Sequence, residues 1–264
     1  MSLITSLTRV WLTRSLRPFH FTSQFDPVLP VEDALHPGLY IHIPFCRTLC
    51  SFCPYCKVVY SAALASAYVD ALKREIVLVG SRFPARKTVT SLYFGGGTPA
   101  LLAGEIAGLM DTVRRYFTIT EGVGLELHPL DVTVETLQTL KAAGVTRISI
   151  GIQSFSDAYL DILGRGTQNW APMFAALRAV PFETVSMDFI FALPGQTIDS
   201  VREDIETAFA NGANHVALYP FIDFTYTSRS FPKMPEGEKK RLLSDITSYC
   251  AEQGYVRDSI WTFA

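Results

Sequence analysis

Short apolar runs alternate along the chain with longer segments of helical period. The runs predict strands at 39–44, 90–94, 123–127, 146–151, 184–190 and 214–219. Apolar residues three and four positions apart predict helices at 61–80, 104–117, 133–143, 156–163, 170–179, 197–211 and 236–253. Strands that alternate with helices in this way indicate a parallel sheet with right-handed crossovers.

Six strand–helix units predict an α/β fold with the geometry of a partial barrel, because a closed eight-stranded barrel needs two more units. No low-complexity segment or linker divides the chain after residue 36. We therefore expect an N-terminal extension at 1–36 and a single core domain at 37–264. In such folds the chemistry lies at the carboxyl ends of the strands, so residues that follow the strands are the candidates for a site.

Composition excludes several classes of protein. The 264 residues are 48% hydrophobic and 18% charged, and 23 basic residues balance 25 acidic ones. A net charge of −2 offers no broad basic face, so we expect no nucleic-acid partner. No run approaches the ~18 consecutive apolar residues of a membrane span, so we expect no membrane partner either.

The first 25 residues carry three arginines and no acidic residue. This composition is typical of a mitochondrial transit peptide, and it also fits a short surface helix followed by a loop. We favour the second interpretation and expect the protein in the cytoplasm, with the mitochondrion as the alternative.

Four of the five cysteines lie within eleven residues, at Cys46, Cys50, Cys53 and Cys56. Such a cluster indicates a metal site in a reducing compartment rather than a disulfide framework. The spacing Cys46-x3-Cys50-x2-Cys53 can hold three irons of a four-iron, four-sulfur cluster and leave one iron open. A structural zinc ion and a redox-active Cys-x-x-Cys pair are the alternatives, although zinc usually takes two ligand pairs that lie further apart.

Several further motifs occur in order along the chain. They are YIHIPFC at 40–46, FGGGTP at 94–99, ELHP at 126–129, SIGIQSF at 149–155, LGR at 163–165 and MDFIFALPGQT at 187–197. Together with the cysteines they resemble the radical S-adenosylmethionine (SAM) enzymes, and more narrowly the group of oxygen-independent coproporphyrinogen III oxidase. The resemblance runs from about residue 39 to 264 and implies a partial (βα)6 TIM-like barrel of the radical SAM type.

The resemblance also implies the cofactors. Cys46, Cys50 and Cys53 would hold a [4Fe-4S] cluster whose open iron binds SAM, and a flavodoxin- or ferredoxin-type donor would reduce it so that SAM yields a 5′-deoxyadenosyl radical. The implied SAM contacts are Tyr40, Phe52, Gly96, Gly97, Thr98, Glu126, Gln153, Arg165, Asp188 and Ile222. Each has a structural alternative: a core aromatic, a tight turn, a solvated charge or a buried acceptor. His42 is expected to be a hydrogen-bonded strand histidine, and Cys250 a buried apolar residue.

The implied substrate is a porphyrin or haem-type tetrapyrrole. Oxidative decarboxylation of coproporphyrinogen III and anaerobic haem degradation by radical methyl transfer are both compatible with the group. A haem-binding or haem-delivery protein is the alternative of another class, and a zinc-stabilised α/β domain is a third.

The chain departs from the group in two respects. Pro54 and Tyr55 stand between Cys53 and Cys56, where the oxidase has a single residue, and His128 replaces an Asn or Asp. The chain also ends where members of the group continue into a C-terminal helical region. We therefore expect a fragment or truncated product that cleaves SAM weakly, without tight coupling to substrate.

Overall fold

The structure is a computed structural model that describes residues 33–222 and 232–264. The chain divides into two units, Met1–Leu35 and His36–Ala264, and the second contains all the helices and strands described. The extension expected at 1–36 and any targeting role of residues 1–25 fall almost wholly outside the described residues.

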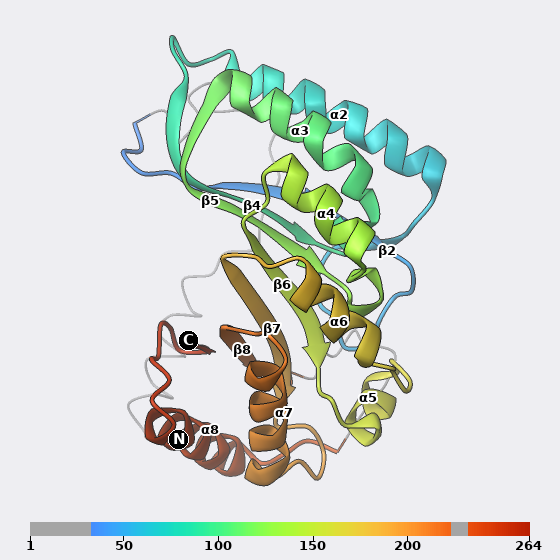
Figure 1. The fold of residues 1–264 in the computed structure, drawn as a ribbon, viewed down its shortest axis with the longest axis vertical. Coiled ribbons are helices and arrows are strands. Elements are labelled where there is room, and N and C mark those ends of the chain that lie inside the picture. The colour runs from blue at the N-terminus through green and yellow to red at the C-terminus, as the bar shows by residue number, and fades with distance from the viewer. Residues whose placement is uncertain (1–32, 223–231) are drawn as a thin grey trace, which may run out of the picture. The chain divides into compact units, whose positions relative to one another are not determined.

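One seven-stranded sheet organises this unit, in the order β1-β4-β5-β6-β7-β8-β9 (Figure 1). Its parallel strands are β1 (Leu39–Ile43), β4 (Lys87–Gly96), β5 (Phe117–Leu127), β6 (Arg147–Gln153), β7 (Thr184–Phe191) and β8 (His215–Pro220). All six strands expected from the sequence are therefore confirmed. The short strand β9 (Thr262–Phe263) adds to β8 in antiparallel orientation. Its two residues are too few to carry a detectable alternation.

A second, two-stranded sheet pairs β2 (Phe45–Cys46) with β3 (Val58–Val59). Strand β5 begins six residues earlier than expected and pairs there with β4 alone. Residue 117, expected at the end of a helix, is instead the first residue of β5.

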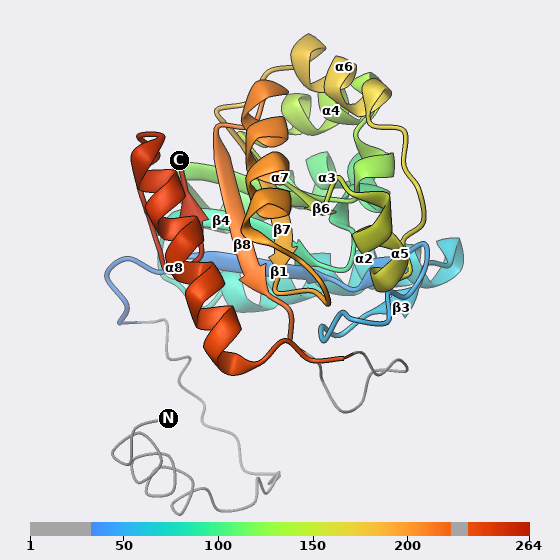
Figure 2. The ribbon, with the colours of Figure 1, turned by 90° about the horizontal axis from the view of Figure 1, so that it is seen from below.

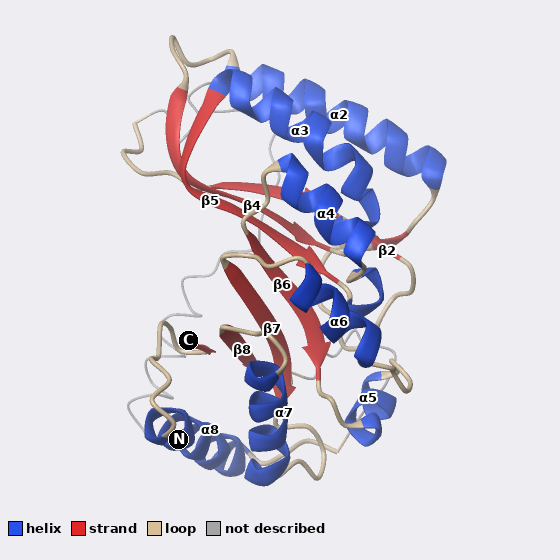
Figure 3. Ribbon diagram, in the orientation of Figure 1, coloured by secondary structure: helices blue, strands red, loops and turns tan. Residues whose placement is uncertain are grey.

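The helices between the strands also agree with the sequence pattern. They are α2 (Ala62–Gly80), α3 (Ala103–Tyr116), α4 (Val134–Ala143), α5 (Asp157–Leu163), α6 (Ala171–Ala179), α7 (Ile198–Ala210) and α8 (Glu236–Glu252). Figure 3 shows α2, α3, α4, α6 and α7 on one face of the large sheet. Figure 2 shows α8 at the β8 edge of the sheet, beside α7. The Tyr249 hydroxyl on α8 donates a 2.7 Å hydrogen bond to the Glu206 carboxylate on α7. Among the described residues, no helix is long and apolar enough to span a membrane.

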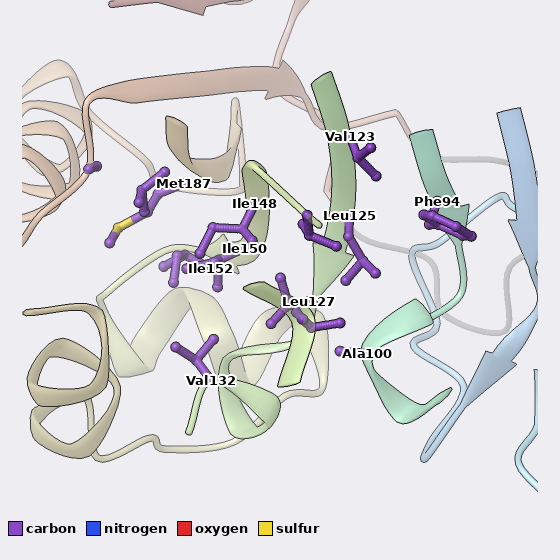
Figure 4. Packing of buried hydrophobic residues seen from close by; sticks show 14 of the residues in the cluster. Phe94, Ala100, Val123, Leu125, Leu127, Val132, Ile148, Ile150, Ile152 and Met187 are labelled. Atoms are coloured by element: carbon purple, nitrogen blue, oxygen red, sulfur yellow. The ribbon is translucent and has the colours of Figure 1, made fainter. Parts of the chain in front are cut away.

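Alternation along the strands separates an apolar face from a polar one. Leu125 and Leu127 on β5 and Ile148 and Ile150 on β6 are buried and pack together in the core (Figure 4). Successive side chains of a strand point to opposite faces, so the residues between them lie on the face away from these helices. The sequence thereby places polar side chains in rows on the face that carries the candidate site.

Asp204 on α7 anchors the loop that follows β6. It is 4% exposed and accepts hydrogen bonds from the Ser154 hydroxyl at 2.8 Å and the Phe155 amide at 2.7 Å. Burial raises its pKa from 3.8 to about 6, although both hydrogen bonds act in the opposite direction. The folded state therefore holds this proton more tightly than the unfolded state does.

This raised pKa predicts how stability depends on pH. The contribution of Asp204 to the free energy of unfolding is fully present below pH 3.8 and is lost as the pH rises through about 6. The loss should be about 3 kcal/mol at full ionisation. An Asp204→Asn variant should lack this component, so urea unfolding from pH 3.5 to 7 should show a flatter profile than the wild type. Parallel profiles for the two proteins would contradict the assignment.

Candidate functional site

The cysteine loop connects β2 to β3. Cys46 ends β2, and its carbonyl accepts a 2.9 Å hydrogen bond from the Tyr60 amide, which closes the loop at its base. Cys46, Cys50 and Cys53 are half-buried, whereas Cys56 is exposed. The three cysteines of the predicted cluster thus differ in environment from the fourth.

Burial and the neighbouring thiols both act on the Cys46 thiol. Burial is the main cause that raises the pKa of the Cys46 thiol; the Thr98 hydroxyl, 3.9 Å from its Sγ, lowers it, and Cys53 and Cys50 raise it further. Among the described side chains, no three His, Cys, Asp or Glu groups are placed to hold a metal ion. In a four-iron cluster sulfides bridge the irons and each bound iron takes one thiolate, so the cysteines need not converge on one ion. Three thiols on one loop fit that donor set.

A glycine turn at the end of β4 lies directly against this loop. The Gly97 amide donates to the Ile43 carbonyl at 2.8 Å, and the Thr98 amide donates to the Phe45 carbonyl at 2.7 Å. A Cβ added at Gly97 would lie 2.6 Å from the Phe45 carbonyl oxygen and 2.7 Å from the Pro44 carbonyl carbon. Only glycine allows this approach of two backbone segments.

Glu126 on β5 reaches the same turn. Its Oε2 accepts a 2.9 Å hydrogen bond from the Gly96 amide, and its Oε1 would lie 3.0 Å from a Cβ at Gly95. Burial raises the pKa of Glu126, while the Gly96 amide, the Tyr93 hydroxyl and His42 lower it. The structure therefore brings Glu126 and the glycine turn together.

Tyr40 and His42 line the β1 side of the site. Tyr40 is 58% exposed, and its ring stacks on Tyr93 with centroids 6.3 Å apart. The His42 ring contacts the Tyr40 hydroxyl at 3.1 Å through Nδ1 and the Cys56 carbonyl at 2.9 Å through Nε2. A carbonyl can only accept, so Nε2 donates and Nδ1 accepts. His42 is thus a hydrogen-bonded strand residue, as expected.

Arg165 and Phe52 join the cysteine loop to the end of β6. The Arg165 Nη1 donates to the Gly151 carbonyl, and its guanidinium lies 5.8 Å from the Phe52 ring centroid. Phe52 also packs on a small buried cluster that includes Leu163. The buried Nε of Arg165 has no hydrogen-bond partner, so a donor remains for a ligand. Gln153, at the end of β6, has a φ of 74°, a strained value for a residue other than glycine.

Asp188 on β7 is the second carboxylate of the site. Its oxygens accept hydrogen bonds from the Ser149 hydroxyl at 2.5 Å and the Ser186 hydroxyl at 3.0 Å. Burial raises its pKa to about 6, with Glu126 adding to the shift and the two serines opposing it. Ile222 lies two residues beyond β8 with 53% of its surface exposed.

Sequence reasoning missed several residues that support these groups. Ser149 and Ser186 could have been found from strand alternation, since both occupy the polar face. Arg47, next to Cys46, forms an ion pair with the buried Asp131, 84 residues later, and so ties the cysteine loop to the turn after β5. No local sequence pattern predicts an ion pair between residues so far apart in the chain.

His128, which departs from the group's pattern, remains neutral. Burial and the nearby Arg165 and Arg47 lower its pKa to about 3. Its Nδ1 accepts a 3.2 Å hydrogen bond from the Leu130 amide and so begins the turn of residues Pro129–Asp131. Cys250 is fully buried in α8, as expected, and burial raises the pKa of its thiol to about 11.

A cavity of about 520 Å³ lies elsewhere, at the opposite end of the sheet from the cysteine loop. It is lined by Arg86, Arg114, Thr118 and Gly144, among others. None of the residues expected to bind the cluster or SAM lines it.

Known proteins resemble this chain over most of its length. A sequence model of the radical SAM superfamily matches residues 40–208. The heme chaperone HemW of Bacillus subtilis is 35% identical over 191 residues, which are 69% of this chain and 50% of that protein. The oxygen-independent coproporphyrinogen III oxidase of Pseudomonas aeruginosa is 28% identical over 251 residues, 88% of this chain and 54% of that protein.

Among solved structures, coproporphyrinogen III oxidase (HemN) from Escherichia coli superposes with a TM-score of 0.77 at 28% identity, covering 87% of this chain and 56% of that one. The chain spans about half the length of the curated relatives that it matches. These matches confirm the resemblance and the α/β fold expected from the motifs.

Proposed function

We propose that this chain, which belongs to the radical SAM superfamily, binds a [4Fe-4S] cluster through Cys46, Cys50 and Cys53 and acts with SAM on a porphyrin or haem-type tetrapyrrole. The family uses both cofactors. The observation that carries the proposal is the meeting of the cysteine loop with the glycine turn and Glu126 at the carboxyl end of the parallel sheet. Ligands of α/β folds bind at that end.

When bound, the cluster would supply one electron that breaks the C5′–S bond of SAM, which releases methionine and a 5′-deoxyadenosyl radical; the radical takes a hydrogen atom from the substrate to become 5′-deoxyadenosine. The chain's own residues would bind and orient SAM. Glu126, already bonded to the Gly96 amide, offers carboxylate acceptors to an ammonium group. The planar fork of Arg165 suits a carboxylate, and its Nε is free to donate. The aromatic faces of Tyr40 and Phe52 would border the adenosine.

The tetrapyrrole rests on the relatives, among which are coproporphyrinogen III oxidases and heme chaperones. A flavodoxin- or ferredoxin-type donor would reduce the cluster in the cytoplasm or the mitochondrion. A second candidate function is haem binding and delivery without substrate conversion. It is favoured by the HemW relatives, which reach 35% identity, compared with 28% for the oxidase of P. aeruginosa.

The test uses the full chain, reconstituted with iron and sulfide under anaerobic conditions and reduced with dithionite. We expect slow formation of 5′-deoxyadenosine from SAM, and a rise in its rate, without tight coupling to product, when coproporphyrinogen III or haem is added. Mass spectrometry would show whether decarboxylated or methylated product forms. Stoichiometric haem binding without conversion of either tetrapyrrole would favour the delivery function. An intact cluster that yields no 5′-deoxyadenosine would contradict the enzymatic proposal.

A further inference from the structure

A row of polar residues crosses four neighbouring strands beside Asp188. Glu126 on β5 is paired with Ser149 on β6, and Ser149 is paired with Ser186 on β7. Ser186 is in turn paired with His215 on β8. Residues paired across neighbouring strands point to the same face, so the row lies on the face opposite the apolar core. Asp188, two residues after Ser186, shares that face.

The two serines hold Asp188 from two strands at once. The Ser149 hydroxyl donates to Oδ2 at 2.5 Å, and the Ser186 hydroxyl donates to Oδ1 at 3.0 Å. Each carboxylate oxygen has two lone pairs, so both oxygens can still accept a hydrogen bond from a ligand. Rotation of the carboxylate would break both serine contacts, and its orientation is therefore set by the sheet.

The hydrogen bonds also determine the tautomer of His215. Ser186 has one hydroxyl proton, which it donates to Asp188, so its 2.9 Å contact with His215 must be donated by Nδ1. The other ring nitrogen lies 3.9 Å from Asp258 Oδ2, in the segment between α8 and β9. That contact is an ion pair only when His215 is protonated, so in the neutral form the hydrogen bonds run from His215 through Ser186 to Asp188.

We propose that Ser149 and Ser186 are positioning residues for SAM, which hold the Asp188 carboxylate in one orientation, and that His215 sets the direction of the Ser186 hydroxyl. This inference rests on the proposed function, because Asp188 is assigned to SAM by family resemblance.

The hydrogen bonds from Ser149 and Ser186 also affect the protonation of Asp188. The carboxylate is buried and faces a second one, Glu126, and both causes favour its protonated form. The titratable groups near it include Tyr93, Tyr219 and Tyr55, on β4, β8 and the cysteine loop; burial is the main cause that raises the pKa of each, and Asp188 raises it further. Among the described groups, the two serine hydroxyls are those that act on Asp188 in the opposite direction. Loss of either serine would therefore leave a carboxylate that both rotates and retains its proton more readily.

Binding of S-adenosylhomocysteine, an analogue of SAM without the sulfonium, tests the proposal by calorimetry on the reconstituted full chain. Hydrogen bonds to charged groups are strong enough that Ser149→Ala and Ser186→Ala should each weaken binding by about tenfold or more. Ser149→Thr and Ser186→Thr keep the hydroxyl and should restore it. Ser91→Ala is the matched control, since Ser91 is half-buried on the same face of the sheet, on β4, and should bind like the wild type.

A double variant at Ser149 and Asp188 separates a positioning role of the serine from a merely structural one. If the serines act through Asp188, Ser149→Ala should weaken binding no further in an Asp188→Asn background. A ligand-free measurement adds to this: nitrogen-15 NMR should find the His215 proton on Nδ1, and Ser186→Ala should shift it toward Nε2. An His215→Gln variant identifies the signal among the five histidines.

The outcomes are distinguishable. If the wild type and Ser91→Ala both fail to bind S-adenosylhomocysteine, the proposed function fails and this inference fails with it. If the wild type binds and the two serine-to-alanine variants bind equally well, only the positioning role is overturned. If His215 in the wild type carries its proton on Nε2 alone, the proposal that His215 sets the direction of the Ser186 hydroxyl is overturned.

Discussion

Alanine at Cys46, Cys50 or Cys53 should abolish the formation of 5′-deoxyadenosine. Each of these thiols would hold one iron, and a cluster that loses one of three protein ligands is not retained in its four-iron form. We expect the rate of SAM cleavage to fall by more than about a hundredfold, because the electron that cleaves SAM comes from the cluster. Iron content and the absorbance of the reconstituted protein should fall in parallel.

Two other cysteines in the chain provide the controls. Cys56 is exposed and its carbonyl, rather than its thiol, contacts His42, so Cys56→Ala should retain the cluster. Cys250 is fully buried in α8, far along the chain from the loop, and Cys250→Ala should lower stability modestly while leaving iron content unchanged. Full iron content and product formation in Cys53→Ala would rule out the assigned ligands.

Alanine at Gly97 should cause the second large effect. Its Cβ would lie 2.6 Å and 2.7 Å from backbone atoms of Phe45 and Pro44, which precede the first cysteine. Backbone atoms cannot rotate away as a side chain can, so the turn and the cysteine loop must move apart. We expect a loss of about 3 kcal/mol in the free energy of unfolding, as in severe overpacking. We also expect a reduced yield of cluster on reconstitution.

Alanine at a second glycine is the control that distinguishes this steric clash from a general effect of replacing glycine. A Cβ at Gly104 in α3 would meet nothing within 4 Å, and alanine favours a helix over glycine by about 0.5–1 kcal/mol. Gly104→Ala should therefore raise the unfolding midpoint in urea, whereas Gly97→Ala should lower it. Equal midpoints for the two variants would contradict the close approach at Gly97.

The secondary structure was predictable because its signals are local and long. Each parallel strand of the large sheet is followed along the chain by a helix of seven residues or more, and every such helix buries one face at the expected spacing. Thr133 and Thr197, which precede two of these helices, accept hydrogen bonds from first-turn amides. The early start of β5 was missed because its first residues pair with β4 alone, and the alternation of Phe117 and Ile119 with two threonines ends after four residues at Glu121 and Gly122.

The sequence by itself determined the class of fold, the cysteine spacing and the motifs that mark the site, because these depend on periodicity and on residues close together in the chain. The tertiary structure alone decided how they meet. Ser149 reaches Asp188 across 39 residues, His215 reaches Ser186 across 29, and Arg47 reaches Asp131 across 84. Such contacts depend on strand order and register, and these are set by how the whole sheet buries its apolar face against the helices.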